Sequence, residues 1–315
     1  MTSAVDSKTD RKHRSSIEKG IDRSFIWLTA FFAFLVAGFL LWIAIRVGIQ
    51  AIPAIKEFGW SFLTGSSWNP PEQQYAILPM IYGTIVSSLI ALLIAFPVGV
   101  ACALVLSENF LPKSVRHILV FLVELLAAIP SVVYGLWGIY VLIPFLKPIG
   151  SWLHSNLGWI PLFSTNYIGP GMFPAGIILS IMILPILTAI ARDSLASLPP
   201  DLRSGSYAVG STRWQTIFSV LIPAAFSGII GGTMLALGRA LGETMAATLV
   251  IGNSNDLNFS ILAPANTIAS LMANQFSEAS GLQRQSLMYA GLVLFAITLV
   301  VNILAELIIQ KVKKY

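Results

Sequence analysis

The stretch AAFSGIIGGTMLALGRALGETMAATLVIG, residues 224–252, decides the fold. It consists of apolar, small and hydroxyl residues apart from two charged ones, Arg239 and Glu243. It exceeds the roughly 20 residues that a helix needs to cross the hydrocarbon core of a bilayer. Over the whole chain of 315 residues, 56% are apolar and only 10% are charged, whereas a soluble domain has about 25% charged residues. The protein is therefore expected to be embedded in a membrane.

Further apolar runs lie on both sides of this stretch. The first 24 residues are polar, and the apolar run that follows them is too long for a cleaved signal peptide. The pattern predicts an all-α integral membrane protein with six transmembrane helices. They are expected at residues 25–48, 79–106, 115–143, 171–197, 224–252 and 285–310. The expected domains are a tail at 1–24, a first span at 25–48, a loop at 49–78 and a membrane core at 79–311.

The placement of lysine and arginine predicts the orientation. Loops on the cytoplasmic side of a membrane carry an excess of these residues. With the N-terminus inside, only four basic residues fall on the outer side: Arg46, Lys56, Lys147 and Arg284. Both termini are therefore expected in the cytoplasm. The net charge of +5 is spread over tails and loops rather than over one face, so it does not indicate nucleic-acid binding.

One connection on the predicted cytoplasmic side, PPDLRSGSYAVGSTRWQTIFSVLIP (199–223), has its own helical pattern. Two prolines end the preceding span, Asp201 can cap a short helix, and Gly210 can form the left-handed turn that ends it. Ser211 or Thr212 can cap the next helix. That helix is expected to carry four apolar residues on one face: Trp214, Ile217, Phe218 and Leu221. The loop is either an ordinary interfacial connector or a docking element for a cytoplasmic partner.

This loop resembles the coupling loop of ABC-importer permeases. In that family a Glu-Ala-Ala triplet is followed by three residues, a glycine, nine residues and the pattern Ile-x-Leu-Pro. Gly210 matches the glycine, and the closing apolar residues and Pro223 stand at the matching distance. The triplet reads Ser204, Gly205 and Ser206 here, so the acidic residue is missing. By resemblance, these five residues couple the permease to its ATPase.

Three further stretches are similar to the PstC-type permease subunit of phosphate ABC importers. They are VELLAAIPSVVYGLWG (123–138), GIILSIMILPILTAIARDSL (176–195) and LGRALGETMA (237–246). The sister PstA-type subunit typically continues Gly-Glu-Thr with Ala-Pro. The resemblance, over about residues 79–311, implies a type-1 importer-permease fold in the bacterial inner membrane. It also implies four partners: a PstA-like second permease, two PstB-like ATPase subunits and an extracytoplasmic phosphate-binding protein.

Arg239 and Glu243 stand near the middle of the predicted fifth span. A charge at the bilayer centre costs about 2.5–3.5 kcal/mol on insertion scales, so such a group faces protein or water. Four residues apart on a helix, the two share a face. They either form a private ion pair that locks the span in place, or line the translocation path. In the path, the guanidinium fork of Arg239 would bind phosphate.

Glu124 is the other acid predicted inside the membrane, in the third span. Pro130 follows it and would loosen the backbone there. Glu124 is either protonated and structural, or it pairs with a cation in the path. An alternative function follows from these acids: an ion-coupled secondary transporter that uses Glu124 or Glu243 as a proton relay. Against it, no inverted repeat and no paired broken helices are visible in the sequence.

The sequence contains no residue set for chemistry. GSYAVGST (205–212) has two glycines five residues apart, as phosphate-binding loops do, but it lacks their lysine and a preceding strand. We therefore expect no enzymatic activity and no cofactor in this chain, with ATP bound by a partner subunit.

Overall fold

The computed structural model describes residues 16–312 of the chain, and most of them are helical. Within these residues, six segments are long and apolar enough to cross a membrane, as predicted. They are Asp22–Phe58, Leu78–Ser107, Ser131–Leu157, Met172–Ala196, Arg213–Leu241 and Gly281–Lys311. The N-terminal part of the predicted tail, residues 1–15, and the last three residues lie outside the described part.

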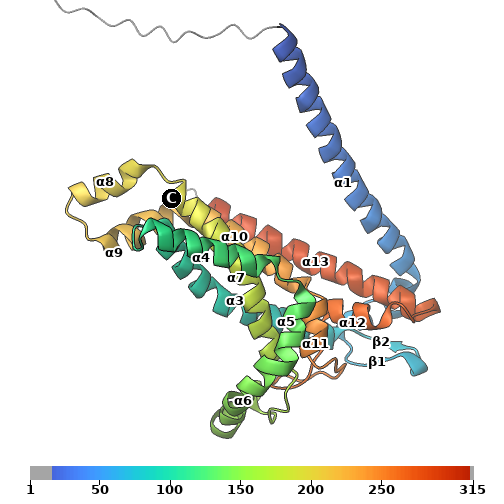
Figure 1. Cartoon of the computed structure of the whole chain (residues 1–315). Helices are drawn as coiled ribbons and strands as arrows, with labels where there is room; N and C mark the ends of the chain where they lie inside the picture. The colour runs from blue at the N-terminus through green and yellow to red at the C-terminus, as the bar shows by residue number, and fades with distance from the viewer. Residues whose placement is uncertain (1–15, 313–315) are drawn as a thin grey trace, which may run out of the picture. The chain divides into compact units, whose positions relative to one another are not determined.

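The described residues form thirteen α-helices. Figure 1 labels most of them. The long ones are α1 (Ser16–Phe58), α3 (Leu78–Ser107), α4 (Lys113–Ala128), α6 (Ile143–Leu157), α7 (Met172–Ala196), α10 (Ile222–Leu241) and α13 (Gly281–Val312). The short ones are α2 (Ser61–Thr64), α5 (Ser131–Trp137), α8 (Pro200–Ala208), α9 (Arg213–Thr216), α11 (Met245–Val250) and α12 (Ile268–Gln275). Strands β1 (Trp68–Asn69) and β2 (Gln74–Tyr75) pair antiparallel, with Trp68 opposite Tyr75. Single 3₁₀ turns lie at Pro70–Glu72 and Pro161–Phe163.

The chain divides into two compact units, Met1–Ile49 and Gln50–Tyr315. The described part of the first unit is one stretch of α1, whose apolar side chains lie exposed on all sides of the helix. A helix that is apolar all round is typical of a membrane span. The division of the membrane core at residue 79 remains a prediction.

The centre of the second unit is built from α3, α7 and α10. Glycines allow these helices to approach closely, as small residues do in membrane bundles. A Cβ on Gly99 of α3 would stand 2.3 Å from the Leu187 side chain of α7. A Cβ on Gly228 of α10 would stand 2.0 Å from the Ser194 Oγ of the same helix α7. Two apolar clusters fill the spaces between these three helices.

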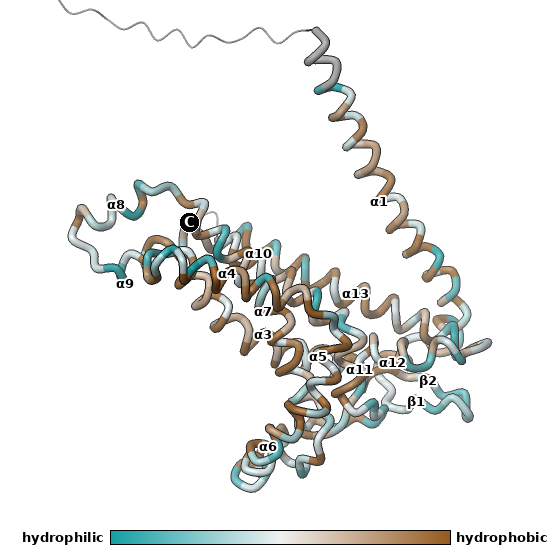
Figure 2. The backbone as a smooth tube through the Cα atoms, viewed as in Figure 1, coloured by the Kyte–Doolittle hydropathy of each residue, from teal (hydrophilic) through white to brown (hydrophobic). Residues whose placement is uncertain are grey.

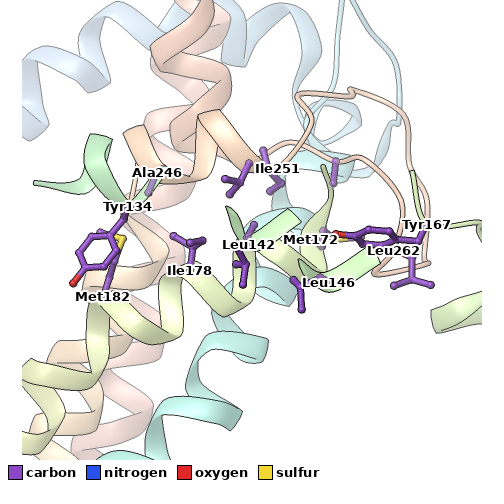
Figure 3. Packing of buried hydrophobic residues seen from close by; sticks show 13 residues of the cluster. Tyr134, Leu142, Leu146, Tyr167, Met172, Ile178, Met182, Ala246, Ile251 and Leu262 are labelled. Atoms are coloured by element: carbon purple, nitrogen blue, oxygen red, sulfur yellow. The ribbon is translucent and has the colours of Figure 1, made fainter. Parts of the chain in front are cut away.

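Two further apolar clusters lie toward the end of the second unit that holds α6, α12 and the β-hairpin (Figure 1). Figure 3 shows the larger one, in which Tyr134, Leu142, Ile178, Ala246 and Ile251 converge from different segments of the chain. The loop before α7 closes on this cluster through Tyr167, whose hydroxyl donates to the Ile143 carbonyl at 3.3 Å. Burial raises the pKa of Tyr167 to about 12.

The bounds predicted for the third span, 115–143, are wrong. The chain instead forms α4, which ends at Ala128, and a new helical segment that starts at Ser131. With 16 residues, α4 is shorter than the roughly 20 that a span needs. The break follows from Pro130, which disfavours helical geometry at Ile129. The crossing segment is Ser131–Leu157.

Two π-helical turns interrupt the spans, at Gly138–Leu142 and Ile217–Leu221. Each is followed after one residue by a proline, Pro144 or Pro223. A proline lacks the N–H that would close the preceding α-helical turn, and its ring crowds the carbonyl four residues earlier. The wider π turn relieves both problems.

Candidate functional site

The predicted fifth span is not one helix. It was expected over residues 224–252, but α10 ends at Leu241 and α11 begins at Met245. Between them the hydroxyl of Thr244 donates to the Gly242 carbonyl at 3.2 Å. The Glu243 carboxylate accepts the backbone N–H of Ala246 at 3.3 Å. Side chains that bond to nearby backbone compete with a continuous helix, and glycine is a weak helix former.

This break separates Arg239 from Glu243. Arg239 is exposed in the last turn of α10, and Glu243 is half-buried in the break. Among the described residues the guanidinium has no hydrogen bond or ion pair, so the private ion pair of the two residues is not formed. The sequence therefore identified an unusual charge, but the expected shared helix face is wrong.

The structure does not bring Glu124 into contact with this pair. Glu124 lies exposed on α4 rather than inside a crossing segment, and it has no hydrogen bond or ion pair among the described residues. The C-terminal end of α4 is tied to the third crossing segment, where the Leu126 carbonyl accepts the Tyr134 hydroxyl at 2.9 Å. The described residues thus supply no cation for Glu124.

Two broken helices meet at the same place. The segment after the break at Pro130 is α5, and the segment after the break at Gly242 is α11. They pack directly, because a Cβ on Gly135 of α5 would stand 2.5 Å from Leu249 of α11. The sequence did not reveal this packing of α5 on α11. Irregular backbone at membrane depth is tolerated where it is buried in protein or lines a cavity.

The predicted coupling loop folds into two short helices joined by a turn. Gly210 has a φ of 85° and supplies the left-handed residue of the turn. Thr212 begins α9 through a capping box with Gln215. Asp201 does not cap α8; it lies in the first turn of a helix that begins with Pro200. Both the left-handed turn and the threonine cap are thus as predicted.

The apolar face predicted for the second helix splits into two stripes. Ile217 and Leu221 are buried in the core, whereas Trp214 and Phe218 are exposed and stack on each other with ring centroids 6.0 Å apart. Phe110 extends this stack, and Arg213 lies over its ring. Figure 2 shows that α8 and α9 are more hydrophilic than the helices of the bundle. The element therefore presents exposed aromatic side chains, together with Val209 and Leu202, on a surface that is more polar than that of the bundle helices.

The predicted coupling residues differ in their surroundings. Ser204 and Gly205 are exposed on α8, and Pro223 is exposed near the start of α10. Ser206 is half-buried, and its hydroxyl bonds to that of Thr216 at 2.9 Å, which ties α8 to α9.

An ion pair that the sequence did not reveal also holds α8. Arg203 donates to the Glu108 carboxylate at 2.8 Å, although the two residues are far apart in the chain. Glu108 is buried at the C-terminal end of α3. The only indication of this pair in the sequence was that Glu108 and Arg203 lie in two connections that are predicted on the same side of the membrane.

Known proteins with the same architecture identify the class. The family model "Binding-protein-dependent transport system inner membrane component" matches residues 95–314. A crystal structure of a bacterial ABC transporter that imports the acidic polysaccharide alginate is 18% identical and superposes with a TM-score of 0.62, covering 94% of this chain and 99% of that chain. The methionine transporter MetNI in an inward-facing form gives a TM-score of 0.53 at 16% identity, over 75% of this chain and 94% of that chain. The fold is that of an ABC-importer permease, an integral component of the inner membrane.

Proteins that are similar in sequence define the family more narrowly than the fold does. The phosphate transport system permease protein PstC of Haemophilus influenzae is 42% identical over 93% of this chain and 95% of its own length. PstC of Mesorhizobium japonicum is 43% identical over 89% and 87%. The probable PstC of Methanocaldococcus jannaschii is 39% identical over 81% and 83%. The chain belongs to the PstC family of binding-protein-dependent inner-membrane permeases.

Proposed function

We propose that the chain forms half of a phosphate path across the bacterial inner membrane. The other half comes from a PstA-like permease, two PstB-like ATPase subunits dock on α8 and α9, and a phosphate-binding protein delivers the anion from outside. The substrate follows from relatives that are named phosphate permeases and match nearly their full length. Both termini lie in the cytoplasm in this arrangement, as the distribution of basic residues predicts.

One observation carries the path: an exposed arginine in the last turn of the fifth crossing segment that forms no ion pair with any described residue. A cation at bilayer depth is costly unless it meets water, an anion or a partner. The guanidinium presents a planar set of donors that matches two phosphate oxygens at once. Glu243 belongs to the path because it holds the start of α11 beside this arginine. Glu124 is exposed on α4, and in this proposal its cation comes from the second permease.

The aromatic stack of Trp214 and Phe218 supports docking of the ATPase at α8 and α9. Exposed aromatic residues on a polar surface are typical of the centre of a protein interface. The chain itself is not the motor in this proposal, and ATP is bound by the partner subunits. The stretch 205–212 supports this, because it forms the end of α8 and a capping turn and follows α7 rather than a strand.

The proposed function is tested by uptake of labelled phosphate into cells. Loss of the ATPase subunit should abolish uptake through the complex, whereas a protonophore should leave uptake intact while cellular ATP is maintained. The reverse result would favour an ion-coupled carrier, although the match to ABC-importer permeases does not favour it.

The role of Arg239 is tested by substitution with lysine. Arg239→Lys keeps the charge but loses the bidentate geometry, and one lost hydrogen bond to a charged group costs about 1.5–3 kcal/mol. We expect uptake to fall about tenfold or more with normal membrane levels and normal ATPase binding. Arg192→Lys is the control, because Arg192 pairs with the exposed Asp193 at the end of α7. Near-native uptake in Arg239→Lys, or in the double variant Arg239→Leu with Glu243→Leu, would show that the arginine is only structural.

A further inference from the structure

Helix α8 is attached to the rest of the chain by very few side chains. Of its nine residues, Pro200–Ala208, only Arg203 and Ser206 are not exposed. They stand three residues apart and therefore on the same face of the helix. The hydroxyl of Ser206 bonds to that of Thr216, the last residue of α9, and α8 also lies against the π turn at Ile217–Leu221. Arg203 adds the contacts from α8 to α3 and α7.

The guanidinium of Arg203 bonds to the ends of two central helices at once. Its Nε and Nη2 donate to Oε1 of Glu108 at 3.1 and 2.8 Å. Glu108 follows the last turn of α3 directly, and its backbone N–H bonds to the Leu104 carbonyl. The same guanidinium donates to the carbonyls of Leu195 at 2.9 Å and Leu198 at 3.3 Å, at the end of α7. A cation is favourable at the C-terminal end of a helix.

Burial makes this contact rigid. Glu108 is 7% exposed, and its carboxylate has no alternative cation among the described residues. Its backbone carbonyl also accepts a bond from Arg116 at 3.3 Å, which joins the start of α4 to the same point. A bidentate guanidinium bond is more directional than contact between apolar groups. Along the chain, α8 is joined to α7 through Pro199 and to α9 through the left-handed turn at Gly210.

We propose that Arg203 and Glu108 are positioning residues that transmit movement of α8 to α3 and α7. The proposal rests on the proposed function, in which the ATPase subunits move α8 when they bind and hydrolyse ATP. Because α3, α7 and α10 pack closely through glycines, displacement of α3 and α7 also moves the helix that carries Arg239.

The experiment uses the assembled transporter in proteoliposomes with phosphate-loaded binding protein. The quantity measured is the number of phosphate ions transported per ATP hydrolysed. Arg203→Lys keeps the charge balance but loses the bonds to α7, and Glu108→Leu with Arg203→Met replaces the pair by apolar side chains without leaving a buried charge alone. We expect the ratio to fall about threefold to thirtyfold in both, in the range by which residues between coupled sites change coupling. Copurification of the ATPase subunits should be unchanged.

Asp193→Asn is the matched control. It removes an ion pair at the same end of α7, but one whose carboxylate is 69% exposed, and the ratio should stay native. A native ratio in the double apolar variant and in Arg203→Lys would overturn the proposal, because the pair would then contribute only to stability. A fall in Arg203→Lys that comes with loss of ATPase subunits would also overturn it, in favour of a role in assembly. If the native complex takes up phosphate without its ATPase, the proposed function itself fails, whatever the variants do.

Discussion

Gly210 shows how one backbone angle can govern an interface. Its φ is 85°, a region that costs most residues about 1–2 kcal/mol. A Cβ at this position would meet no atom within 4 Å, so the cost of a side chain is conformational and not steric. The residue lies between α8 and α9, and its angle sets the direction of one helix relative to the other.

We therefore expect Gly210→Val to lower phosphate uptake per ATP while the protein inserts and assembles. A β-branched residue is the least suited to a left-handed turn. Gly210→Asn is the comparison, since asparagine tolerates this region, and it should keep most of the coupling. Full coupling in Gly210→Val would show that the turn can be remodelled without loss.

The structural role of a single residue could be predicted where it depends only on neighbouring residues in the sequence. Gly210 and Thr212 were recognised because a left-handed turn and a helix cap depend on a few neighbouring residues. Glu108 and Arg203 were not, because their pairing depends on how α3, α7 and α8 pack. The contact of Glu243 with the Ala246 N–H was also missed, because a continuous helix was assumed there.

At the scale of the element, α10 carries glycines with opposite surroundings. A Cβ on Gly228 would stand 2.0 Å from Ser194 Oγ and 2.5 Å from Ser194 Cβ, whereas a Cβ on Gly231 would meet nothing within 4 Å. One glycine therefore allows α10 to approach α7, and the other lies on an open side of the helix.

Gly228→Ala should destabilise the folded protein by about 1–3 kcal/mol, as overpacking does, and Gly231→Ala should not. The measurement is the midpoint of thermal unfolding of each variant in the same detergent. Adding Ser194→Gly to Gly228→Ala removes the obstructing atoms and should restore the midpoint. Equal midpoints for the two alanine variants would mean that α7 and α10 separate more easily than their packing indicates.

The number of spans was predictable because each apolar run is long, but their interruptions were not. The predicted third and fifth spans ran through breaks at Pro130 and Gly242. A sequence signal existed for the π turns, since VLIP occurs at 141–144 and again at 220–223. In both copies the leucine is the last residue of the π turn. Apolar periodicity does not detect such turns, because their residues are as apolar as those of the flanking helix.

At the scale of the whole molecule, the orientation in the membrane remains a prediction. With both termini in the cytoplasm, α8 and Lys113 face inward and the loop at Trp159 faces outward. Cysteine labelling in a Cys102→Ala background tests this, because Cys102 is the only cysteine of the chain. Trp159→Cys should react with a membrane-impermeant maleimide in spheroplasts, whose inner membrane is intact. Lys113→Cys should react only after permeabilisation, and the opposite pattern would reverse the topology.

The segment Ser131–Leu157 has a consequence for how the protein is made. It has the lowest hydropathy of the six candidate spans, and it contains prolines and a π turn. Its glycines pack on residues that are synthesised later: Gly135 on Leu249, and Gly138 on Val250. During synthesis, this segment reaches the translocon before Leu249 and Val250 have been made. Its final packing in the bilayer therefore requires α11, and a polypeptide truncated before Leu249 would leave Gly135 and Gly138 without these side chains, while the contacts with α7 are kept.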